Sequence, residues 1–391
     1  MRTRTEPQVA PTTCSAYSVR LGEPLAGTAP VARAWLAIEQ PGPWGARALT
    51  QSHFDPELGA ELNRRAEAAG VRIAMIRRVG HHALPNSHGP LDPDYIAAGS
   101  YSPGSSGSQG SLGSSDSYGS PDSSGSPDSP EQRFSRRVLL ASTAPGRCSV
   151  RAMDISDPRL LLDLDFAALG AGRITVGDPH PAPVLLVCTN ARRDQCCAVR
   201  GRALALDIAE LVAVAAAESG GASEFGSAIA GSQGGLAASA VAGLELWESD
   251  HLGGHRFAPT AVVLPTGYVY GRLDAGTALE AVRAAADRRV LARSCRGRST
   301  WSRHGQAADL ALREQLQEFD EAAVEIVAER AVPDSGNTAD AGTRSVVLAC
   351  GCTRYQAVVE QRAAAEARPE SCGKAFGNPA EYIVRSLEKI G

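Results

Sequence analysis

The stretch PVLLVCTNARRDQCC, residues 183–197, is the part of the chain from which the rest can be interpreted. Its apolar run 184–187 predicts a short buried strand, and Cys188 stands where that strand ends. Cys197 follows after eight intervening residues. The adjacent Cys196 is an alternative to Cys197 as a metal ligand. A strand that ends in one cysteine, followed by a loop that ends in another, indicates a candidate metal site.

A second stretch, WESDHLGGH at residues 247–255, contains His251 and His255 four positions apart. Two of the residues between them are glycines, which let the backbone fold tightly because glycine tolerates positive φ. We expect this loop to lie beside the cysteine loop, since both follow predicted strands. Thiolates combined with imidazoles select zinc or an iron–sulfur cluster over hard cations, and the pattern alone leaves both open.

Composition sets limits on the class of protein. The 391-residue chain is long enough for two domains, and its formal net charge of −4 gives no basic footprint for nucleic acid. The first twenty residues have no apolar core of signal-peptide length, and the most apolar later stretch, 203–217, is interrupted by Asp207 and Glu210. Nine scattered cysteines without an export signal are better explained as thiols or metal ligands than as disulfides. We therefore expect a cytoplasmic protein that does not enter the membrane.

Both halves of the chain repeat one order of predicted elements: strand, helix, strand, two hairpin strands, helix. In the first half these are 31–39, 54–69, 71–78, 137–142, 149–154 and 157–169. In the second half they are 184–188, 198–217, 244–248, 261–264, 268–273 and 277–287. This is the order of a thioredoxin-like fold that lacks one middle helix. The predicted fold class is therefore α/β, with two thioredoxin-like units (β-α-β-β-β-α) in tandem.

The predicted domain boundaries follow from this repeat and from one change in composition. Residues 1–98 and 131–176 form the first unit, and 177–294 form the second. Residues 99–130 are almost entirely Ser, Gly, Pro and Asp, which predicts a disordered insert. At 40–45, the position that matches the cysteine loop, the first unit has no Cys or His and hence no metal site. Residues 295–391 form a C-terminal extension with a helix over 306–330 and a small β structure that includes 343–349 and 355–361.

Several long sequence motifs of the chain resemble those of a known family. They are CSAYSVRLGEPLAGTAPVARAWLAIEQPGPWG, CTNARRDQCCAVRGRALA, WESDHLGGHRFAPTAVVLPTGYVYGRL, RGRSTWS and RPESCGK. They resemble the sucrase/ferredoxin-like family, in which members with these motifs are thioredoxin-like ferredoxins. Such members hold a [2Fe–2S] cluster on two Cys and two His. The resemblance therefore implies Cys188, Cys197, His251 and His255 as the cluster ligands here. "Sucrase" is a historical label, and no carboxylate pair suits glycoside hydrolysis.

The function expected from these observations is electron transfer through one [2Fe–2S] cluster, with the electron coupled to a proton by the histidine ligands. This is a carrier rather than an enzyme with its own substrate. No NAD or flavin fingerprint is present, because GSQGG at 231–235 is not GxGxxG. A separate reductase and acceptor are therefore expected as partners. The alternatives are a structural Cys₂His₂ zinc protein and a thiol oxidoreductase of thioredoxin type that uses Cys196 and Cys197.

Other residues carry weaker signals. Four charged residues flank the candidate site and suit either a solvated loop or a role in tuning the cluster or docking a partner: Arg192, Arg193, Asp194 and Arg256. Trp247 is expected in the core. Cys350 and Cys352, with Cys372 downstream, suggest a second metal site that lacks an evident fourth ligand. Cys14, Cys148 and Cys295 are expected to be structural.

Overall fold

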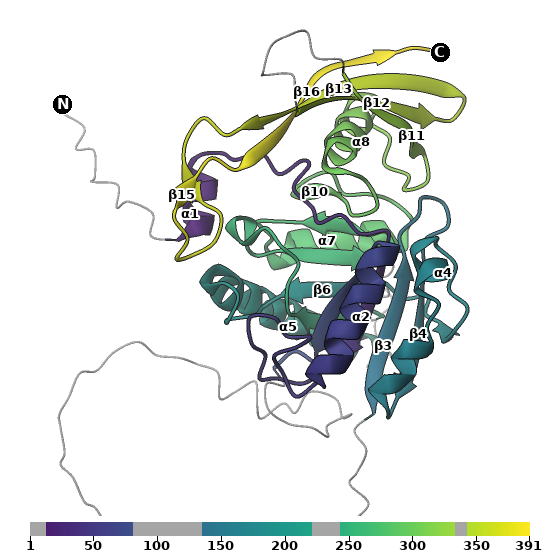
Figure 1. Cartoon of the computed structure of the whole chain (residues 1–391), viewed down its shortest axis with the longest axis vertical. Helices are drawn as coiled ribbons and strands as arrows, with labels where there is room; N and C mark the ends of the chain where they lie inside the picture. Colours follow the sequence, from purple (N-terminus) through teal and green to yellow (C-terminus); the bar gives the residue numbers. More distant parts are fainter. Residues whose placement is uncertain (1–12, 81–134, 221–242, 333–341) are drawn as a thin grey trace, which may run out of the picture.

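The computed structural model of the chain describes residues 13–80, 135–220, 243–332 and 342–391. Over these residues the protein is a mixed α/β fold, as the sequence predicts (Figure 1). Ten described strands form one large sheet, four form a second sheet and two form a short ribbon. None of the helices in the described ranges is long and apolar enough to cross a membrane. The predicted insert, 99–130, lies outside the described residues.

The two halves of the large sheet share one pattern of strand pairing. In each half a central strand pairs in parallel with the next strand and antiparallel with a third, which pairs antiparallel with a fourth. The first half contains β1 (Ala34–Glu39), α2 (Pro56–Ala69), β2 (Val71–Arg77), β3 (Arg136–Ser142), β4 (Ser149–Ile155), the 3₁₀ helix η1 (Pro158–Asp163), α4 (Phe166–Gly170) and β5 (Asp178–Pro179). The second half contains β6 (Val184–Cys188), the π-helical turn η2 (Cys197–Gly201), α5 (Arg202–Gly220), β7 (Glu245–Ser249), the 3₁₀ turn η3 (His255–Phe257), β8 (Ala261–Leu264), β9 (Tyr268–Tyr270) and α7 (Ala275–Ala286).

One antiparallel contact joins the halves into a continuous sheet. Strand β2 pairs with β7 through Ile76 and Arg77, opposite Ser249 and Glu248. Arg77 donates from Nε and Nη2 to Oε2 of Glu248 at 2.9 and 2.8 Å, and both side chains are buried. The sheet order is β10-β9-β8-β6-β7-β2-β1-β3-β4-β5. The parallel strands β6 and β7 therefore lie next to the first half.

Local capping explains where the helices of the first half begin and end. Asp55 accepts hydrogen bonds from the backbone of the first turn of α2, Pro56 opens the helix, and Gly70 ends it with φ of 70°. The sequence predicts this helix over 54–69, so its end agrees and its start lies two residues later, at Pro56. The single helix predicted over 157–169 is wrong, because Asp157 caps the 3₁₀ helix η1 and Asp165 caps a separate helix α4.

The core has one layer on each side of the central strands. Strands β1 and β6 are buried along their whole lengths, as strands covered on both faces are. Helices α2 and α4 cover one face of the first half, and α5 and α7 cover one face of the second. A further apolar cluster is shared by both halves and includes Trp35, Trp247 and three site cysteines: Cys188, Cys196 and Cys197. Trp247 is thus a core residue, as predicted.

The C-terminal extension adds one strand to the large sheet and a second sheet beside it. Strand β10 (Cys295–Arg298) pairs with β9. Helix α8 (Arg303–Leu316) packs on the four-stranded sheet formed by β11 (Val324–Ala331), β12 (Thr343–Cys350), β13 (Thr353–Ala363) and β16 (Ala380–Lys389). The helix predicted over 306–330 is therefore wrong beyond Leu316. The domain boundaries at 98, 131, 177 and 295 stay predictions.

The end of the extension returns to the N-terminal helix. Helix α1 (Cys14–Arg20) lies beside the ribbon of β14 (Arg368–Pro369) and β15 (Phe376–Gly377), as Figure 1 shows. The rings of Tyr17 and Phe376 meet edge to face with centroids 5.1 Å apart. The first and last described segments thus pack together over one end of the large sheet.

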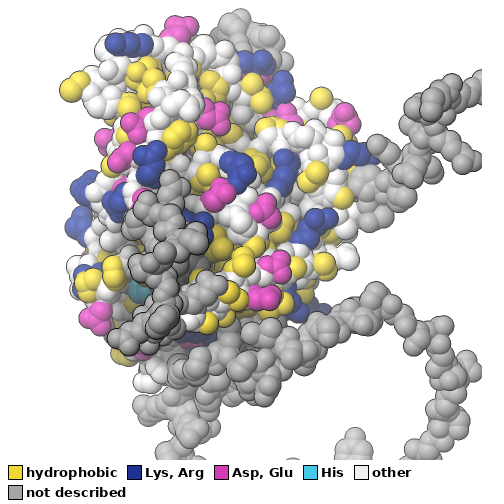
Figure 2. Space-filling model, turned by 180° about the vertical axis from the view of Figure 1, so that it is seen from behind, with side chains coloured by type: hydrophobic (Ala, Val, Ile, Leu, Met, Phe, Trp, Pro, Cys, Tyr) yellow, Lys and Arg dark blue, Asp and Glu magenta, His cyan; other side chains and the backbone are white. Residues whose placement is uncertain are grey.

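Charges of both signs are distributed over the surface. Figure 2 shows Lys and Arg interspersed with Asp and Glu on the face opposite to that of Figure 1. This face has no broad basic field of the kind that binds nucleic acid. The absence of a nucleic-acid partner stays a prediction.

Candidate functional site

The first two candidate ligands are positioned by the end of β6 and by the turn that leads into α5. Strand β6 ends at Cys188, which is 1% exposed. The chain then crosses the loop 189–196 and enters η2, which begins at Cys197. Gly201 ends this turn against the strand, because a side chain there would collide with the carbonyl of Cys188. This close approach holds η2 over the end of β6.

The two histidines lie on the loop after β7. Because β6 and β7 are parallel, both loops leave the sheet at the same edge. Gly253 and Gly254 have φ of 74° and 72°, in the left-handed region that favours glycine. The Arg296 guanidinium lies against Gly254 and donates to the Gly253 carbonyl at 3.0 Å. The resulting tight loop brings the His255 ring next to the His251 ring.

The structure brings the four predicted side chains together. Cys188 contacts Cys197 and His251, and Nδ1 of His251 lies 3.1 Å from Nε2 of His255. Cys188, Cys197 and His255 are buried, whereas His251 is half-buried. Two nitrogens bound to one tetrahedral metal at about 2.1 Å are about 3.4 Å apart. The imidazole pair is close to that spacing, and the sulfur and nitrogen donors suit a soft metal centre.

Electrostatics favour the metal-binding forms of Cys188 and His251, but they favour the protonated thiol of Cys197. The contacts with Cys197 and then with His251 hold the pKa of Cys188 well below its ordinary value, although burial opposes them. The same contact with Cys188, together with burial, raises the pKa of Cys197. Burial lowers the pKa of His251, which keeps this imidazole neutral at pH 7. Thiolate and neutral imidazole are the ligating forms.

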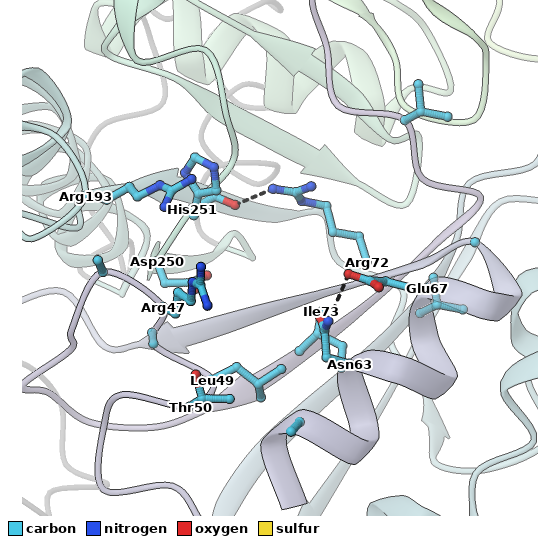
Figure 3. A pocket seen from close by; sticks show the side chains of 16 residues that line it. Arg47, Leu49, Thr50, Asn63, Glu67, Arg72, Ile73, Arg193, Asp250 and His251 are labelled. Carbon is cyan, nitrogen blue, oxygen red and sulfur yellow. Dashed lines mark hydrogen bonds between the residues drawn. The ribbon is translucent and has the colours of Figure 1, made fainter. Parts of the chain in front are cut away.

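A cleft gives the site access to solvent. It measures about 600 Å³ and is lined by α2, β2 and loop 46–50 of the first half and by Arg193, Asp250 and His251 of the second. Figure 3 shows the His251 ring beside the Arg193 side chain. Across the cleft, Arg72 donates from Nη2 to the His251 carbonyl at 2.8 Å (Figure 3). One edge of the four-residue group therefore faces an open cleft bordered by arginines.

A second group of potential ligands lies directly beside the first. The side chains of Cys14, Asp194, Cys196 and Cys372 have ligand atoms within 4.8 Å of one another. Cys196 Sγ is 3.5 Å from Cys14 Sγ and 3.4 Å from Cys372 Sγ. Cys196 thus faces this group, whereas Cys197 faces Cys188. Cys14, which is expected to be structural, lies in this group, and its structural role stays a prediction.

Asp194 connects the two groups. Its Oδ2 accepts hydrogen bonds from Ser371 Oγ at 2.7 Å and from the Cys372 backbone at 2.8 Å, and it lies 3.4 Å from Nδ1 of His255. Burial would raise the pKa of Asp194, but His255, Ser371 and the Cys372 N–H outweigh burial and lower it. Asp194 is therefore a buried carboxylate, and the interpretation of Asp194 as part of a solvated loop is wrong.

The other charged residues around the site divide into two kinds. Arg192 and Arg193 are exposed, as expected of a solvated loop. Arg256 is buried and donates from Nε to Glu23 at 2.6 Å, so it does not belong to the solvated surface. Glu23 also pairs with Arg368 at 2.9 Å, which joins the histidine loop to the C-terminal segment.

The matching loop of the first half, 40–45, is packed without Cys or His. The Trp44 indole N–H donates to the Gln40 carbonyl at 2.8 Å, and Arg77 lies 4.0 Å from its ring. The Gly45 carbonyl accepts from Asn190 Nδ2 at 3.0 Å. This loop supports the cysteine loop of the second half and has none of the expected ligand types.

The four remaining cysteines belong to neither of these two groups: Cys148, Cys295, Cys350 and Cys352. Cys350 and Cys352 flank the turn between β12 and β13, with Cys352 exposed. Cys372 lies instead beside Cys14 and Cys196. The second metal site predicted on this CxC pair with Cys372 is therefore not formed. Cys148 and Cys295 are buried, as expected of structural thiols.

Comparison with known families identifies the family of the chain. The sequence profile described as sucrase/ferredoxin-like matches residues 25–297. The chain belongs to the sucrase/ferredoxin-like family. No curated protein and no solved structure matched the chain. The matched region of this sucrase/ferredoxin-like protein contains all four predicted ligands, while Cys14 and Cys372 lie outside it.

Sequence reasoning missed two members of the second group, Cys14 and the buried Asp194, together with Ser371, which donates a hydrogen bond to Asp194. No spacing rule connects Cys14 with Cys196 or Cys372, which are 182 and 358 positions away. The available signal was that CSAYS and RPESCGK are among the stretches that resemble the sucrase/ferredoxin-like family. Their shared location became clear only from the packing of α1 against the C-terminal ribbon.

Proposed function

We propose that this protein carries electrons on one [2Fe–2S] cluster held by Cys188, Cys197, His251 and His255. The observation that carries the proposal is the meeting of these four side chains at one edge of the sheet. Membership of the sucrase/ferredoxin-like family supports it. When bound, such a cluster accepts and returns one electron.

We also propose that the cluster lies in the second of two thioredoxin-like units, residues 177–294. Support comes from the common strand pairing of the halves and from the order strand, helix, strand, strand, strand, helix. The first unit, whose loop 40–45 has no Cys or His, would act as a scaffold. It supplies Arg72 and one wall of the cleft.

Two arginines place positive charge near the thiolates. Burial, followed by repulsion from Arg256 and Arg303, lowers the pKa of Arg296 to about 9, while the charges of Cys197 and Cys188 act in the opposite direction. Arg72 is likewise within electrostatic reach of Cys188. Positive charge next to a centre that gains an electron stabilises the reduced state and raises the potential. These arginines would therefore favour electron uptake.

Asp194 and Ser371 orient one of the histidines. Ser371 Oγ lies 3.2 Å and Asp194 Oδ2 lies 3.4 Å from Nδ1 of His255. A proton held on Nδ1 by these acceptors leaves Nε2 free to bind metal. Imidazole ligands also retain a proton more tightly when the centre is reduced, so we propose proton-coupled electron transfer.

The electron donor and acceptor would be separate proteins. The cleft at His251 opens the proposed cluster site to solvent, and Arg47, Arg72 and Arg193 line it. We propose that a redox partner with acidic side chains docks there, since complementary charge steers association. Glu67 on α2 is the acidic group at the opposite wall.

The deciding experiment is spectroscopic. The full-length chain is purified anaerobically, its absorption is recorded before and after dithionite, and its iron, sulfide and zinc are counted. About two irons and two sulfides per chain, with visible bands that bleach on reduction, are expected from the cluster. Replacing His255 by Cys should keep the cluster and lower its potential, because a thiolate replaces a neutral ligand.

Other outcomes would favour the competing functions. A colourless chain whose single zinc is lost in C188S would identify a structural Cys₂His₂ zinc site. A chain that stays metal-free after treatment with iron and sulfide would exclude the cluster. A thioredoxin-type mechanism on Cys196 and Cys197 has little support, since these thiols face different partners.

A further inference from the structure

Three thiols from three distant segments form a compact triangle outside the proposed cluster. The Sγ separations are 3.5 Å for Cys14–Cys196, 3.4 Å for Cys196–Cys372 and 3.6 Å for Cys14–Cys372. Zinc binds thiolate sulfur at about 2.3 Å, so two sulfurs on one tetrahedral zinc are about 3.8 Å apart. All three edges lie within a few tenths of an ångström of that value. One metal ion fits this triangle after a small expansion.

Asp194 occupies the fourth corner. Its Oδ1 and Oδ2 each lie 3.8 Å from Cys14 Sγ, and a sulfur and an oxygen on one zinc are about 3.6 Å apart. Oδ2 accepts hydrogen bonds from Ser371 and the Cys372 backbone, whereas Oδ1 accepts one from the Cys196 backbone at 2.7 Å and otherwise faces the Cys14 thiol. A lone pair on Oδ1 remains for a metal, and the other bonds fix the carboxylate in place.

We propose that Cys14, Cys196, Cys372 and Asp194 bind one zinc ion, at a site separate from the proposed cluster. The donors are three soft sulfurs and one oxygen, a set that suits tetrahedral zinc and disfavours hard cations. Cys14, Cys196 and Asp194 are buried, and Cys372 is half-buried. The site is thus closed, as structural zinc sites are.

Hydrogen bonds around the sulfurs prepare them to act as ligands. Ser15 Oγ donates to Cys196 Sγ at 3.2 Å. The backbone N–H groups of Ser15 and Cys14 also reach the sulfurs of Cys196 and Cys372 respectively. Donors directed at ligand atoms orient them and support negative charge on them. Each thiol would release its proton to solvent as zinc binds.

The zinc would hold the segments that contain Cys14 and Cys372 against the loop 189–196. Cys14 begins α1, Cys196 is the last residue of the loop 189–196, and Cys372 lies between β14 and β15 (Figure 1). These segments otherwise meet through the Tyr17–Phe376 ring contact and through the pairing of Glu23 with Arg256 and Arg368. A metal that joins three segments so far apart in sequence stabilises their assembly strongly. It would also fix Asp194 beside His255.

The test counts metals in the full-length chain and in matched variants. The chain is produced in medium that contains iron and zinc, purified without oxygen, and assayed for both metals. We expect about one zinc per chain, a fall of at least about fivefold in C14S/C372S, and unchanged zinc in the control C350S/C352S, whose thiols flank a turn. C188S should lose iron and keep zinc. Equal zinc in C14S/C372S and the unmodified chain would overturn the proposal.

Zinc K-edge absorption on the unmodified chain gives a second test that does not depend on variants that fold. Three sulfurs near 2.3 Å and one oxygen are expected. Two sulfurs and two nitrogens, with zinc lost only in C188S, would place zinc on the histidine site and refute both this proposal and the cluster. Absence of zinc, or a mass lower by about 2 Da from a disulfide among the three thiols, would overturn the zinc site and leave the cluster untouched.

Discussion

Cys196 and Cys197 are adjacent in the chain, yet their thiols belong to different groups of side chains. Cys196 faces Cys14 and Cys372, while Cys197 faces Cys188. The cause is the helical backbone at this turn, where Cys196 has φ of −64° and ψ of −40°. Successive side chains of a helix point about 100° apart. One turn therefore places a thiol in each of the two proposed neighbouring metal sites.

This arrangement predicts opposite metal losses in two single variants. C197S should lose nearly all visible absorption and iron, because it removes a proposed cluster ligand. C196S should keep most of the iron and lose the zinc. Absorption spectra and metal counts on the two proteins, purified side by side, check the prediction. Retained iron in C197S together with lost iron in C196S would reverse the assignment.

A charge change at Arg72 should shift the midpoint potential. Arg72 is within electrostatic reach of Cys188 and holds the His251 carbonyl. R72Q removes the charge, and we expect the potential to fall by on the order of 50 mV, which is about 1 kcal/mol for one electron. R72K keeps the charge and should shift it by less than half as much. A redox titration followed by absorption measures both, and identical potentials in all three proteins would contradict the expected role.

The glycines of the histidine loop offer a matched pair of substitutions. Gly253 and Gly254 have nearly the same positive φ, so alanine at either costs about 1 kcal/mol of strain. A Cβ on Gly254 would also collide with the Arg296 guanidinium, whereas a Cβ on Gly253 meets open space. G254A should therefore be less stable than G253A by about 2 kcal/mol and bind less iron. Thermal unfolding and iron content test this, and equal behaviour of the two variants would exclude the collision as a cause.

The common location of the two loops that carry the four proposed ligands could be predicted from sequence, because each loop follows a strand. The apolar run of β6 ends at Cys188, and a parallel neighbour necessarily ends at the same edge of the sheet. Short-range signals were also sufficient for α2, where Asp55, Pro56 and Gly70 mark both ends. Such signals depend on residues a few positions apart, which a single sequence contains.

The error over 306–330 has a different cause. Gln317 ends α8 in the left-handed conformation, with φ of 53°, although no glycine marks the position. The following residues, VEIVAERA, include good helix formers but form strand β11 because they pair with β12. Pairing with the next strand, β12, here overrides local propensity.

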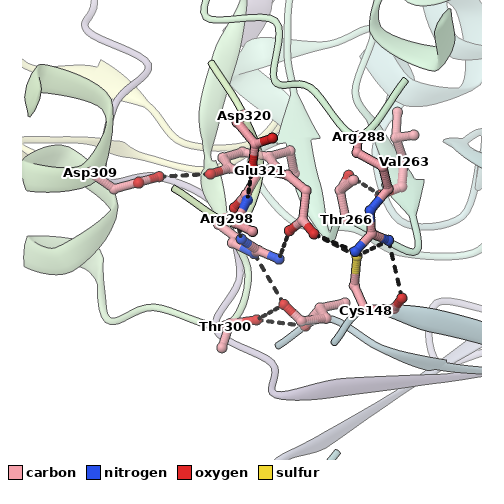
Figure 4. A network of polar contacts seen from close by, with 12 residues as sticks. Cys148, Val263, Thr266, Arg288, Arg298, Thr300, Asp309, Asp320 and Glu321 are labelled. Carbon is pink, nitrogen blue, oxygen red and sulfur yellow. Dashed lines mark hydrogen bonds and ion pairs between the residues drawn. The ribbon is translucent and has the colours of Figure 1, made fainter. Parts of the chain in front are cut away.

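The buried networks of charged side chains could not be predicted from the sequence either. Glu321 is fully buried and accepts from Arg298 at 2.8 Å and from Arg288 at 2.6 Å (Figure 4). Arg298 also donates to the Thr143 carbonyl at 3.0 Å, so this network ties the C-terminal extension to the first half. As sequence, RGRSTW is only a polar, basic stretch. Its burial depends on an acidic partner 23 positions away.

A second buried cluster, around Glu23, gives a prediction about acid stability. Glu23 accepts from Arg256 at 2.6 Å and pairs with Arg368 at 2.9 Å, and all three side chains are buried. E23Q leaves two buried cations without their shared carboxylate. We expect it to lower the free energy of unfolding by about 3 kcal/mol at neutral pH. The control E370Q, which removes an exposed partner 3.7 Å from Arg256, should change it by less than about 0.5 kcal/mol.

The effect of E23Q should depend on pH in one direction. Burial would raise the pKa of Glu23, but hydrogen bonds from Arg368 and the charge of Arg256 outweigh burial and lower it below 4.5. A carboxyl whose pKa is lower in the folded state stabilises the fold above its unfolded pKa, and that contribution is lost as the pH falls through the folded value. The difference between the unmodified chain and E23Q should therefore be constant above about pH 5 and shrink below pH 4.5. Denaturant unfolding at pH 7, 5, 4 and 3 measures it, and a difference that grows towards low pH would show that Glu23 is not the charged partner of these arginines.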